Sequence, residues 1–131
     1  MSIKVSDYIA KFIAKHSSHI FVGQGGNIIH LLDSCDKHKK ITVVPSQNEQ
    51  GASIAADAYS RFKNKIGFTA ATSGPGIINI LQGIACSHFD SVATIHFSGA
   101  VVTSQIRENK KIRQVGFQEM EVVDIVKPIT K

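Results

Sequence analysis

The sequence predicts an α/β fold of three layers, in which a central, mostly parallel sheet lies between two layers of helices. Short apolar runs alternate with longer amphipathic stretches along most of the chain. This alternation is typical of strand–helix–strand units, which build parallel sheets with helices on both faces. The length of 131 residues suits one domain with a substantial core, so we treat residues 1–131 as a single domain.

The individual elements have recognisable signatures. Pro45 ends the second apolar run, because proline cannot donate to a strand ladder, and Pro75 fits the first position of a helix, where its missing N–H costs nothing. The polar, basic segment 103–115 is expected to be a mobile loop. The expected strands cover residues 20–22, 41–44, 66–71 and 91–97, and the expected helices cover 5–16, 27–35, 49–62 and 74–88. A last helix or turn is expected around 117–125.

The composition excludes several classes of protein. Hydrophobic residues make up 43% of the chain and charged residues 19%, with a net charge of +5. The basic residues are scattered, which indicates solvated loops and helix ends, so we expect no nucleic-acid partner. No apolar run approaches the ~20 residues of a membrane span, and charged residues interrupt the N-terminus where a signal peptide would be apolar. We therefore expect a cytoplasmic protein with no membrane partner.

Cysteines and histidines give no sign of a metal site. Cys35 and Cys86 lack the spacing of metal ligands and fit a reduced, cytosolic protein. Cys86 lies in an expected apolar helix, and we expect it to be buried in the protein core. The six histidines show no metal-pair spacing, and His96, within an expected strand, is more often a core histidine than a base. We expect no metal ligand on this chain.

The most informative residue is Glu49, an acid between the second apolar run and an alanine-rich helix. A Gly74-Pro75-Gly76 turn follows the next expected strand. The carboxyl ends of parallel strands meet at one edge of a sheet, where open α/β sheets bind ligands, so Glu49 and this turn would lie side by side. Each feature also has a purely structural interpretation. An acid in the first turn of a helix gains roughly 0.3–1 kcal/mol from the helix dipole, and Gly-Pro-Gly begins a helix well.

Small residues at helical spacing follow Glu49 and allow another backbone to come close. They are Gly51, Ala52, Ala55, Ala56 and Ala58. The sheet beneath the helix and a second subunit are both candidate partners, and the two alternatives are compatible.

The loop Gly23-Gln24-Gly25-Gly26 invites comparison with dinucleotide-binding loops. The third glycine of G-x-G-x-x-G would fall at Ile28, and no acid follows at the end of the second strand. A dinucleotide-binding Rossmann domain is therefore the least supported alternative.

Seven segments, taken in order, carry a resemblance to a known family. They are residues 5–9, 20–21, 48–52, 72–79, 90–92, 117–119 and 125–131, which read VSDYI, IF, NEQGA, TSGPGIIN, DSV, FQE and IVKPITK. Together they resemble the N-terminal pyrimidine-binding domain of thiamine-diphosphate-dependent enzymes of the acetolactate synthase and pyruvate oxidase group. The similarity extends over nearly the whole chain.

The resemblance implies that the cofactor is thiamine diphosphate. In this family a glutamate hydrogen-bonds a ring nitrogen of the aminopyrimidine. The imino tautomer then takes the proton from thiazolium C2 and leaves a nucleophilic ylid. Glu49 matches that glutamate, and a carboxylate can share a proton with a weakly basic nitrogen in a dry site. By the same resemblance, the residues around the cofactor are Gln24, Gly25, Gly26, Glu49, Thr72, Pro75 and Asn79, and Phe117 and Gln118 match a segment that reaches toward substrate.

Two positions depart from the family's pattern and leave the choice of substrate open. Asn48 stands where a histidine usually precedes the glutamate, and Gln24 stands where the first loop usually has a proline. No His-His pair occurs between Gly99 and Met120, which argues against the pyruvate decarboxylase branch.

The chain lacks the Gly-Asp-Gly motif of the family's diphosphate-binding domain and the middle domain that carries FAD in some members. We therefore expect a separate domain of another chain to hold the diphosphate and its Mg²⁺, in a homodimer, with FAD an option for the full enzyme. The chain would be a fragment of a longer enzyme or one subunit of a split one, and inactive alone. The complete enzyme would decarboxylate and join small 2-oxo acids. The alternative is a degenerate, non-catalytic domain kept for dimerisation or interaction.

Overall fold

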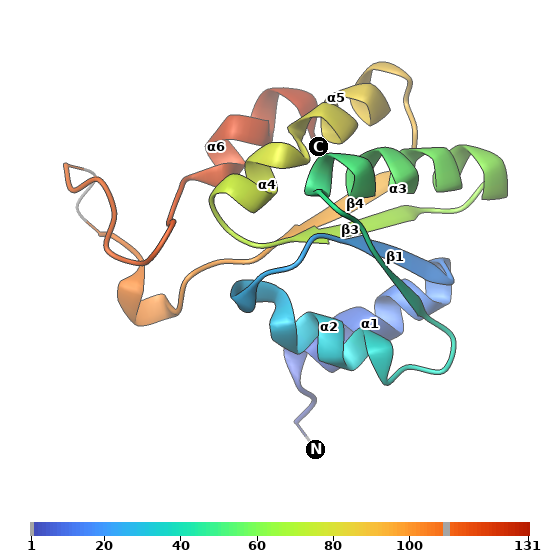
Figure 1. The fold of residues 1–131 in the computed structure, drawn as a ribbon, viewed down its shortest axis with the longest axis horizontal. Coiled ribbons are helices and arrows are strands. Elements are labelled where there is room, and N and C mark those ends of the chain that lie inside the picture. Colours follow the sequence, from blue (N-terminus) through green and yellow to red (C-terminus); the bar gives the residue numbers. More distant parts are fainter. Residues whose placement is uncertain (1, 109–110) are drawn as a thin grey trace.

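The computed structural model describes residues 2–108 and 111–131 as a three-layer α/β/α arrangement around four parallel strands (Figure 1). The strands are β1 (His19–Val22), β2 (Thr42–Pro45), β3 (Gly67–Ala71) and β4 (Thr94–Ser98), in the order β2-β1-β3-β4. The α-helices are α1 (Val5–His16), α2 (Ile29–Asp36), α3 (Glu49–Lys63), α4 (Pro75–Asn79), α5 (Leu81–Phe89) and α6 (Val122–Val126). Short 3₁₀ helices are η1 (Gly26–Ile28), η2 (Thr103–Gln105) and η3 (Lys127–Ile129).

The sheet separates two apolar cores. In Figure 1, α1 and α2 lie on one face of the sheet, and α3, α4, α5 and α6 lie on the other. All five residues of β3 are buried, as expected for a central parallel strand covered on both faces. Phe68 and Ala70 pack into the core beneath α1 and α2, whereas Ala71 packs with Ile77 and Ile80 on the opposite face. This alternation is the period-2 pattern of a strand.

The strand order places a switch point between β1 and β3. The chain leaves β1 for β2 on one side of it and returns to β3 on the other side. The carboxyl ends of β1 and β3 are therefore neighbours, with Val22 paired to Ala70. The connections that follow these two strands diverge to opposite faces of the sheet, which is where open α/β sheets form a crevice for ligands.

The predicted architecture is confirmed, and two local expectations were wrong. The helix expected over 74–88 is two helices, because the N–H of Ile80 bonds the carbonyl of Ile77 at 3.3 Å in a tight turn that ends α4 and buries Ile80. The helix or turn expected around 117–125 is a turn, in which Gln118 is left-handed with φ of 57°, followed by α6. Cys86 is exposed, since the buried face of α5 is formed by Gly83, Ile84 and Ser87.

The segment expected to be a mobile loop, residues 103–115, includes η2. Residues 109 and 110 of that segment lie outside the described residues.

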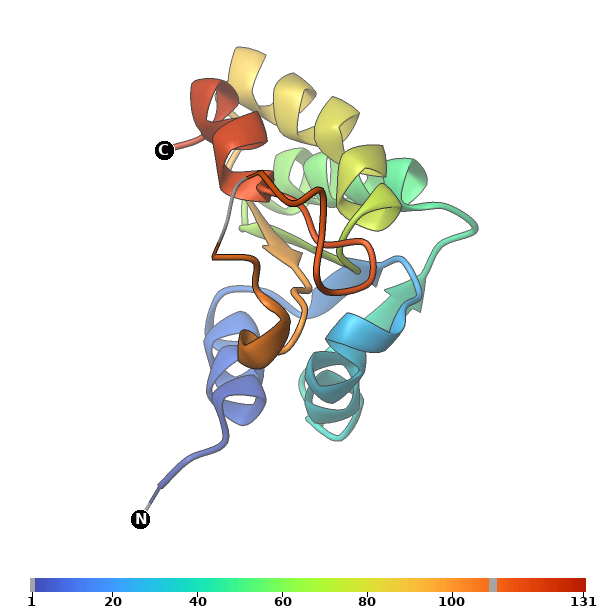
Figure 2. The same cartoon turned by 90° about the vertical axis from the view of Figure 1, so that its left-hand side faces the viewer.

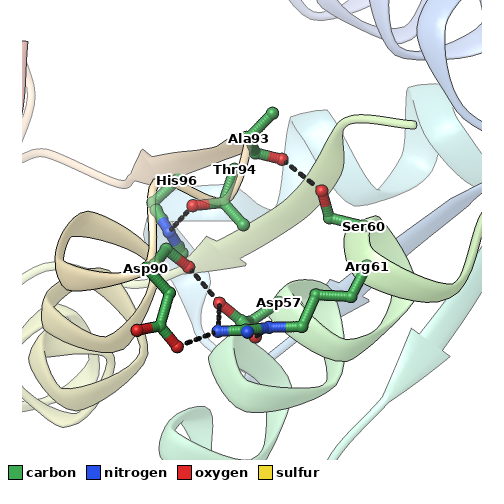
Figure 3. A network of polar contacts seen from close by, with 8 residues as sticks. Asp57, Ser60, Arg61, Asp90, Ala93, Thr94 and His96 are labelled. Atoms are coloured by element: carbon green, nitrogen blue, oxygen red, sulfur yellow. Dashed lines mark hydrogen bonds and ion pairs between the residues drawn. The ribbon is translucent and has the colours of Figure 1, made fainter. Parts of the chain in front are cut away.

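A polar network joins α3, α5 and β4 on the face that α3 covers (Figure 3). The buried carboxylate of Asp57 accepts hydrogen bonds from Arg61 Nε at 2.6 Å and from Ser87 Oγ at 2.8 Å. A second nitrogen of Arg61 donates to Asp90 at 2.6 Å. Burial acts to raise the pKa of Asp57, but the hydrogen bonds from Arg61 and Ser87 outweigh it and hold the pKa below its ordinary value. Asp57 is therefore a buried, ionised anchor between the two helices.

His96 lies beside this network and makes a hydrogen bond of 3.0 Å to Thr94 (Figure 3). Burial lowers the pKa of His96 to about 4, against a partial opposing effect of Asp57. His96 is thus a neutral core histidine at neutral pH, as the sequence predicted.

Candidate functional site

Glu49 is the first residue of α3, directly after the carboxyl end of β2. The side chain of Asn48 begins the helix by accepting a hydrogen bond of 2.8 Å from the N–H of Gly51. Asparagine is a favoured residue at this capping position. Asn48, which departs from the family's usual histidine, therefore has a structural role in placing Glu49, and Glu49 lies where the helix dipole favours a carboxylate.

The side chain of Glu49 reaches back across the end of β1. A Cβ atom added to Gly23 would lie 2.2 Å from Glu49 Cγ, so only glycine leaves room for this course. Glu49 is half-buried, and its Oε2 accepts a hydrogen bond of 2.9 Å from Asn79 Nδ2. The acid is thus held above the switch point between β1 and β3, next to the helix that follows the Gly-Pro-Gly turn.

Thr72 joins the first glycine loop to the same corner. A Cβ added to Gly25 would lie 2.3 Å from Thr72 Cβ, and one added to Gly76 would lie 2.8 Å from Thr72 Cγ2 and 3.7 Å from Glu49 Oε1. These backbones approach the site bare of side chains. Among the sequence-predicted site residues, the structure therefore brings together Gly25, Glu49, Thr72 and Asn79.

A second contact, between Asn27 and Ser73, fixes the two loops to each other. Asn27 Nδ2 donates to Ser73 Oγ at 2.6 Å, and Ser73 is buried. Sequence reasoning did not single out Asn27, and no motif would have found it. The contact depends on how β1 and β3 are placed side by side.

Gln118 reaches the turn from the far end of the chain. A Cβ added to Gly74 would lie 2.6 Å from Gln118 Cβ, and Gly74 itself has φ of 67°, which favours glycine. The neighbouring Phe117 is 77% exposed. Gln118 is therefore part of the corner, whereas Phe117 extends into solvent beside it.

Three other predicted residues face solvent. Gln24, Gly26 and Pro75 are exposed, although they belong to loops that frame Glu49. A hollow of about 430 Å³ lies nearby, between α1, η1 and the end of β4, and its lining includes Asn27 but not Glu49.

Metal and membrane features were also sought. Within residues 2–108 and 111–131, no three histidine, cysteine or acidic side chains gather in a way that could hold a metal ion. In the same residues, no helix combines the length and apolar character needed to cross a membrane.

Comparison with known proteins shows the family of the chain. The family described as "Thiamine pyrophosphate enzyme, N-terminal TPP binding domain" matches residues 3–126. The chain belongs to this family. Thiamine pyrophosphate is thiamine diphosphate, so the family is dependent on the cofactor that the resemblance implied.

Individual relatives of this thiamine pyrophosphate domain are acetolactate synthases. The large subunit from Porphyra purpurea is 39% identical over 116 residues, which are 86% of this chain and 19% of the relative. The large subunit from Buchnera aphidicola subsp. Schizaphis graminum is 33% identical over 94% of this chain and 20% of the relative. "Acetolactate synthase 2, chloroplastic" from Brassica napus is 35% identical over 86% of this chain and 17% of the relative. The chain thus matches about a fifth of each relative's length.

Proposed function

We propose that this thiamine pyrophosphate domain binds the aminopyrimidine half of the cofactor at the carboxyl edge between β1 and β3, and that Glu49 supplies the activating carboxylate. The observation that carries the proposal is the position of Glu49, half-buried over Gly23 and bonded on one oxygen by Asn79. In the described parts of the chain, Asn79 is the one side chain that donates to this carboxylate. The other oxygen, Oε1, is left as an acceptor on the side of Gly76.

The residues present fit a flat, polar ring. At Gly23, Gly25 and Gly76 the space that a Cβ would take is occupied by the side chains of Glu49 and Thr72, so these glycines allow both polar side chains to reach the corner. Thr72 and Asn79 offer a hydroxyl and an amide beside the carboxylate. When bound, thiamine diphosphate supplies a nucleophilic carbon and an electron sink for 2-oxo acid chemistry.

The roles of the chain's own residues follow from their contacts. Glu49 holds a proton between its free oxygen and the ring nitrogen, Asn79 fixes the orientation of the carboxylate, and Asn48 fixes the start of α3. Gln118 and Phe117 contact the substrate from the segment that precedes α6. Phe117 is free to contact substrate or a partner domain because it does not belong to either core.

The complete enzyme, by this proposal, decarboxylates a small 2-oxo acid and joins the product to an acceptor, as acetolactate synthases do. A diphosphate-binding domain of another chain holds the diphosphate and Mg²⁺ against the carboxyl edge, in a homodimer in the cytoplasm. FAD, if the full enzyme uses it, lies in a middle domain and not on this chain. The chain alone is catalytically silent.

A direct test mixes this chain with a candidate partner that carries Gly-Asp-Gly, adds Mg²⁺, thiamine diphosphate and pyruvate, and compares the native chain with Glu49→Gln. Loss of a general acid–base group lowers turnover by about 10²–10⁴-fold. The matched control is Asp36→Asn, an exposed acid at the end of α2, which should leave turnover unchanged. Equal turnover of native and Glu49→Gln proteins would remove Glu49 from the mechanism.

The second candidate is a non-catalytic interaction module. Ala52 and Ala56 are fully buried, which assigns them to helix-on-sheet packing, but Gly51 and Ala58 are exposed on α3 beside Ile54, itself 43% exposed. This face remains open to another backbone. If the module is the whole function, Ala58→Glu should abolish self-association in sedimentation, whereas Glu49→Gln should change neither association nor any activity of the assembly.

A further inference from the structure

The segment between β4 and α6 crosses the carboxyl edge of the sheet with little regular structure beyond η2 (Figure 2). Most of its large apolar side chains are exposed: Val102, Ile106, Ile112, Val115 and Phe117. Met120, near its end, packs against the core that contains Ile77 and Ile80. Burial of apolar surface therefore contributes little to the course of the described residues before Met120, and polar contacts have to fix it.

The side chain of Glu119 holds two parts of this segment together. Its Oε1 accepts a hydrogen bond of 2.6 Å from the backbone N–H of Arg107, and its Oε2 accepts one of 3.0 Å from the backbone N–H of Val115. One carboxylate thus joins two backbone positions that are distant in the loop. These hydrogen bonds, from Val115 first and then Arg107, lower the pKa of Glu119.

Arg107 provides the second closure. Its side chain is 17% exposed, and its guanidinium donates to the carbonyl of Ile112 at 2.9 Å. It also pairs with Glu121 at 3.5 Å. Among the described residues, the charged side chain that acts on Glu119 is that of Arg107. Glu121 is linked to Glu119 only indirectly, by its ion pair with Arg107.

These contacts hold the backbone of Gln118 in a left-handed conformation, which is unfavourable for a residue other than glycine. The N–H of Gly116 bonds the carbonyl of Gln105 at 3.1 Å, and the N–H of Glu119 bonds the carbonyl of Gly116 at 3.3 Å. In this turn Gln118 has φ of 57°, a region that non-glycine residues seldom adopt without support. Its Cβ packs where Gly74 has no side chain. Gly116 and Glu119 flank Gln118, so their contacts fix where it sits.

We propose that Glu119 is a positioning residue, whose carboxylate holds the backbones of Arg107 and Val115 together in a preformed loop and so seats Gln118 against the Gly74-Pro75-Gly76 turn. Glu119 touches neither cofactor nor substrate and acts through Gln118. Closure itself needs no ligand. The functional consequence rests on the proposed function. Gln118 and Phe117 are already in a fixed position when a small 2-oxo acid binds, so no conformational entropy is lost in ordering them at that step.

NMR of the ¹⁵N-labelled chain tests the closure, because a hydrogen-bonded amide senses the charge of its acceptor. As the pH is lowered from about 6 to about 3.5, the amides of Arg107 and Val115 should shift together, with one midpoint below the ordinary glutamate pKa. The sign follows from the lowered pKa of Glu119: closure is fully stabilised above the ordinary value and is lost as the pH falls through the lowered one.

Two variants sharpen the test at neutral pH, where the rest of the chain is unaffected by acid. Glu119→Gln should abolish the common titration and speed hydrogen exchange of the Arg107 and Val115 amides about tenfold, the effect of losing a hydrogen bond to a charged acceptor. Asp124→Asn, which changes an exposed acid on α6, should leave both readings as in the native chain. Independent titration of the two amides, or unchanged exchange in Glu119→Gln, would overturn the proposal.

The consequence has a separate readout. In the reconstituted enzyme, Glu119→Gln should raise the KM for pyruvate about tenfold with a smaller change in kcat, whereas a merely structural role would reduce the amount of active enzyme at unchanged KM. Unchanged KM would overturn the consequence. Failure of the proposed function itself would show elsewhere, as an absence of thiamine diphosphate-induced shifts at Gly23 and Asn79 in the native chain.

Discussion

Asn79, the last residue of α4, donates a hydrogen bond of 2.9 Å to Glu49, the first residue of α3. The pair bridges the ends of two helices that begin from different strands. Asn79 lies where α4 ends, and Ile80 separates α4 from α5. The orientation of the acid is therefore set by a residue outside its own helix.

Removal of this amide should weaken the function of Glu49 without unfolding the domain. Asn79→Ala loses one hydrogen bond to a charged acceptor on an exposed residue, for which about 1 kcal/mol is expected, or about fivefold in turnover of the reconstituted enzyme. Lys39→Ala, which changes an exposed side chain between α2 and β2, is the control and should change neither turnover nor melting temperature. A native turnover number in Asn79→Ala would separate Asn79 from the acid's role.

Gly23 should tolerate no side chain. Gly23→Ala would place a methyl group 2.2 Å from Glu49 Cγ, so Glu49 must swing away and the corner must shift. We expect a loss of about 1–3 kcal/mol in the free energy of unfolding and displaced NMR signals for Glu49 and Asn79. Gly26→Ala is the comparison for stability, since nothing lies within 4 Å of a Cβ there. Equal stability of the two variants would contradict the placement of Glu49 over Gly23.

The Asp57 network should contribute more to stability than an exposed ion pair. Asp57→Asn leaves Arg61 and Ser87 without their charged acceptor in a buried position, and we expect a loss of about 1–3 kcal/mol, reduced by the partial exposure of Arg61. Asp33→Asn breaks the exposed pair with Lys37, which solvent screens, and should lower the free energy of unfolding much less than Asp57→Asn does. Urea denaturation of both variants measures which of them loses more free energy of unfolding.

Acid should destabilise the fold partly through His96. The folded-state pKa of about 4 is below the ordinary 6.5, so the unfolded chain takes up the proton first as the pH falls. The corresponding stability is complete above pH 6.5 and is lost between about pH 6.5 and 4, by up to about 3 kcal/mol. His96→Phe should flatten this part of the pH profile, while His30→Gln, on the exposed surface of α2, should not. Parallel profiles for native and His96→Phe proteins would sink the prediction.

Local signals were enough to predict most of the fold. Alternating apolar runs, Pro45 and Pro75 placed the strands and helices. The division at Ile80 was not, because it depends on the burial of Ile77 and Ile80 against Ala71 and not on a glycine or proline. Cys86 was wrongly predicted to be buried, because the apolar composition of its helix does not show which face of the helix packs against the core.

The site was predictable only in part. Glu49, Thr72 and Asn79 stood in recognisable motifs, and strand order then brought them together. Asn27 and Ser73, and the closure by Glu119, join residues that no sequence spacing relates, since each depends on which strands are neighbours and on the course of residues 99–121.

The most direct test of the central claim is the rate of hydrogen–deuterium exchange at thiazolium C2 of thiamine diphosphate bound to the reconstituted enzyme, in native and Glu49→Gln forms. If the carboxylate over Gly23 activates the cofactor, exchange should slow by about 10²-fold or more in the variant while the cofactor stays bound. Exchange at the native rate with the cofactor bound would contradict the account.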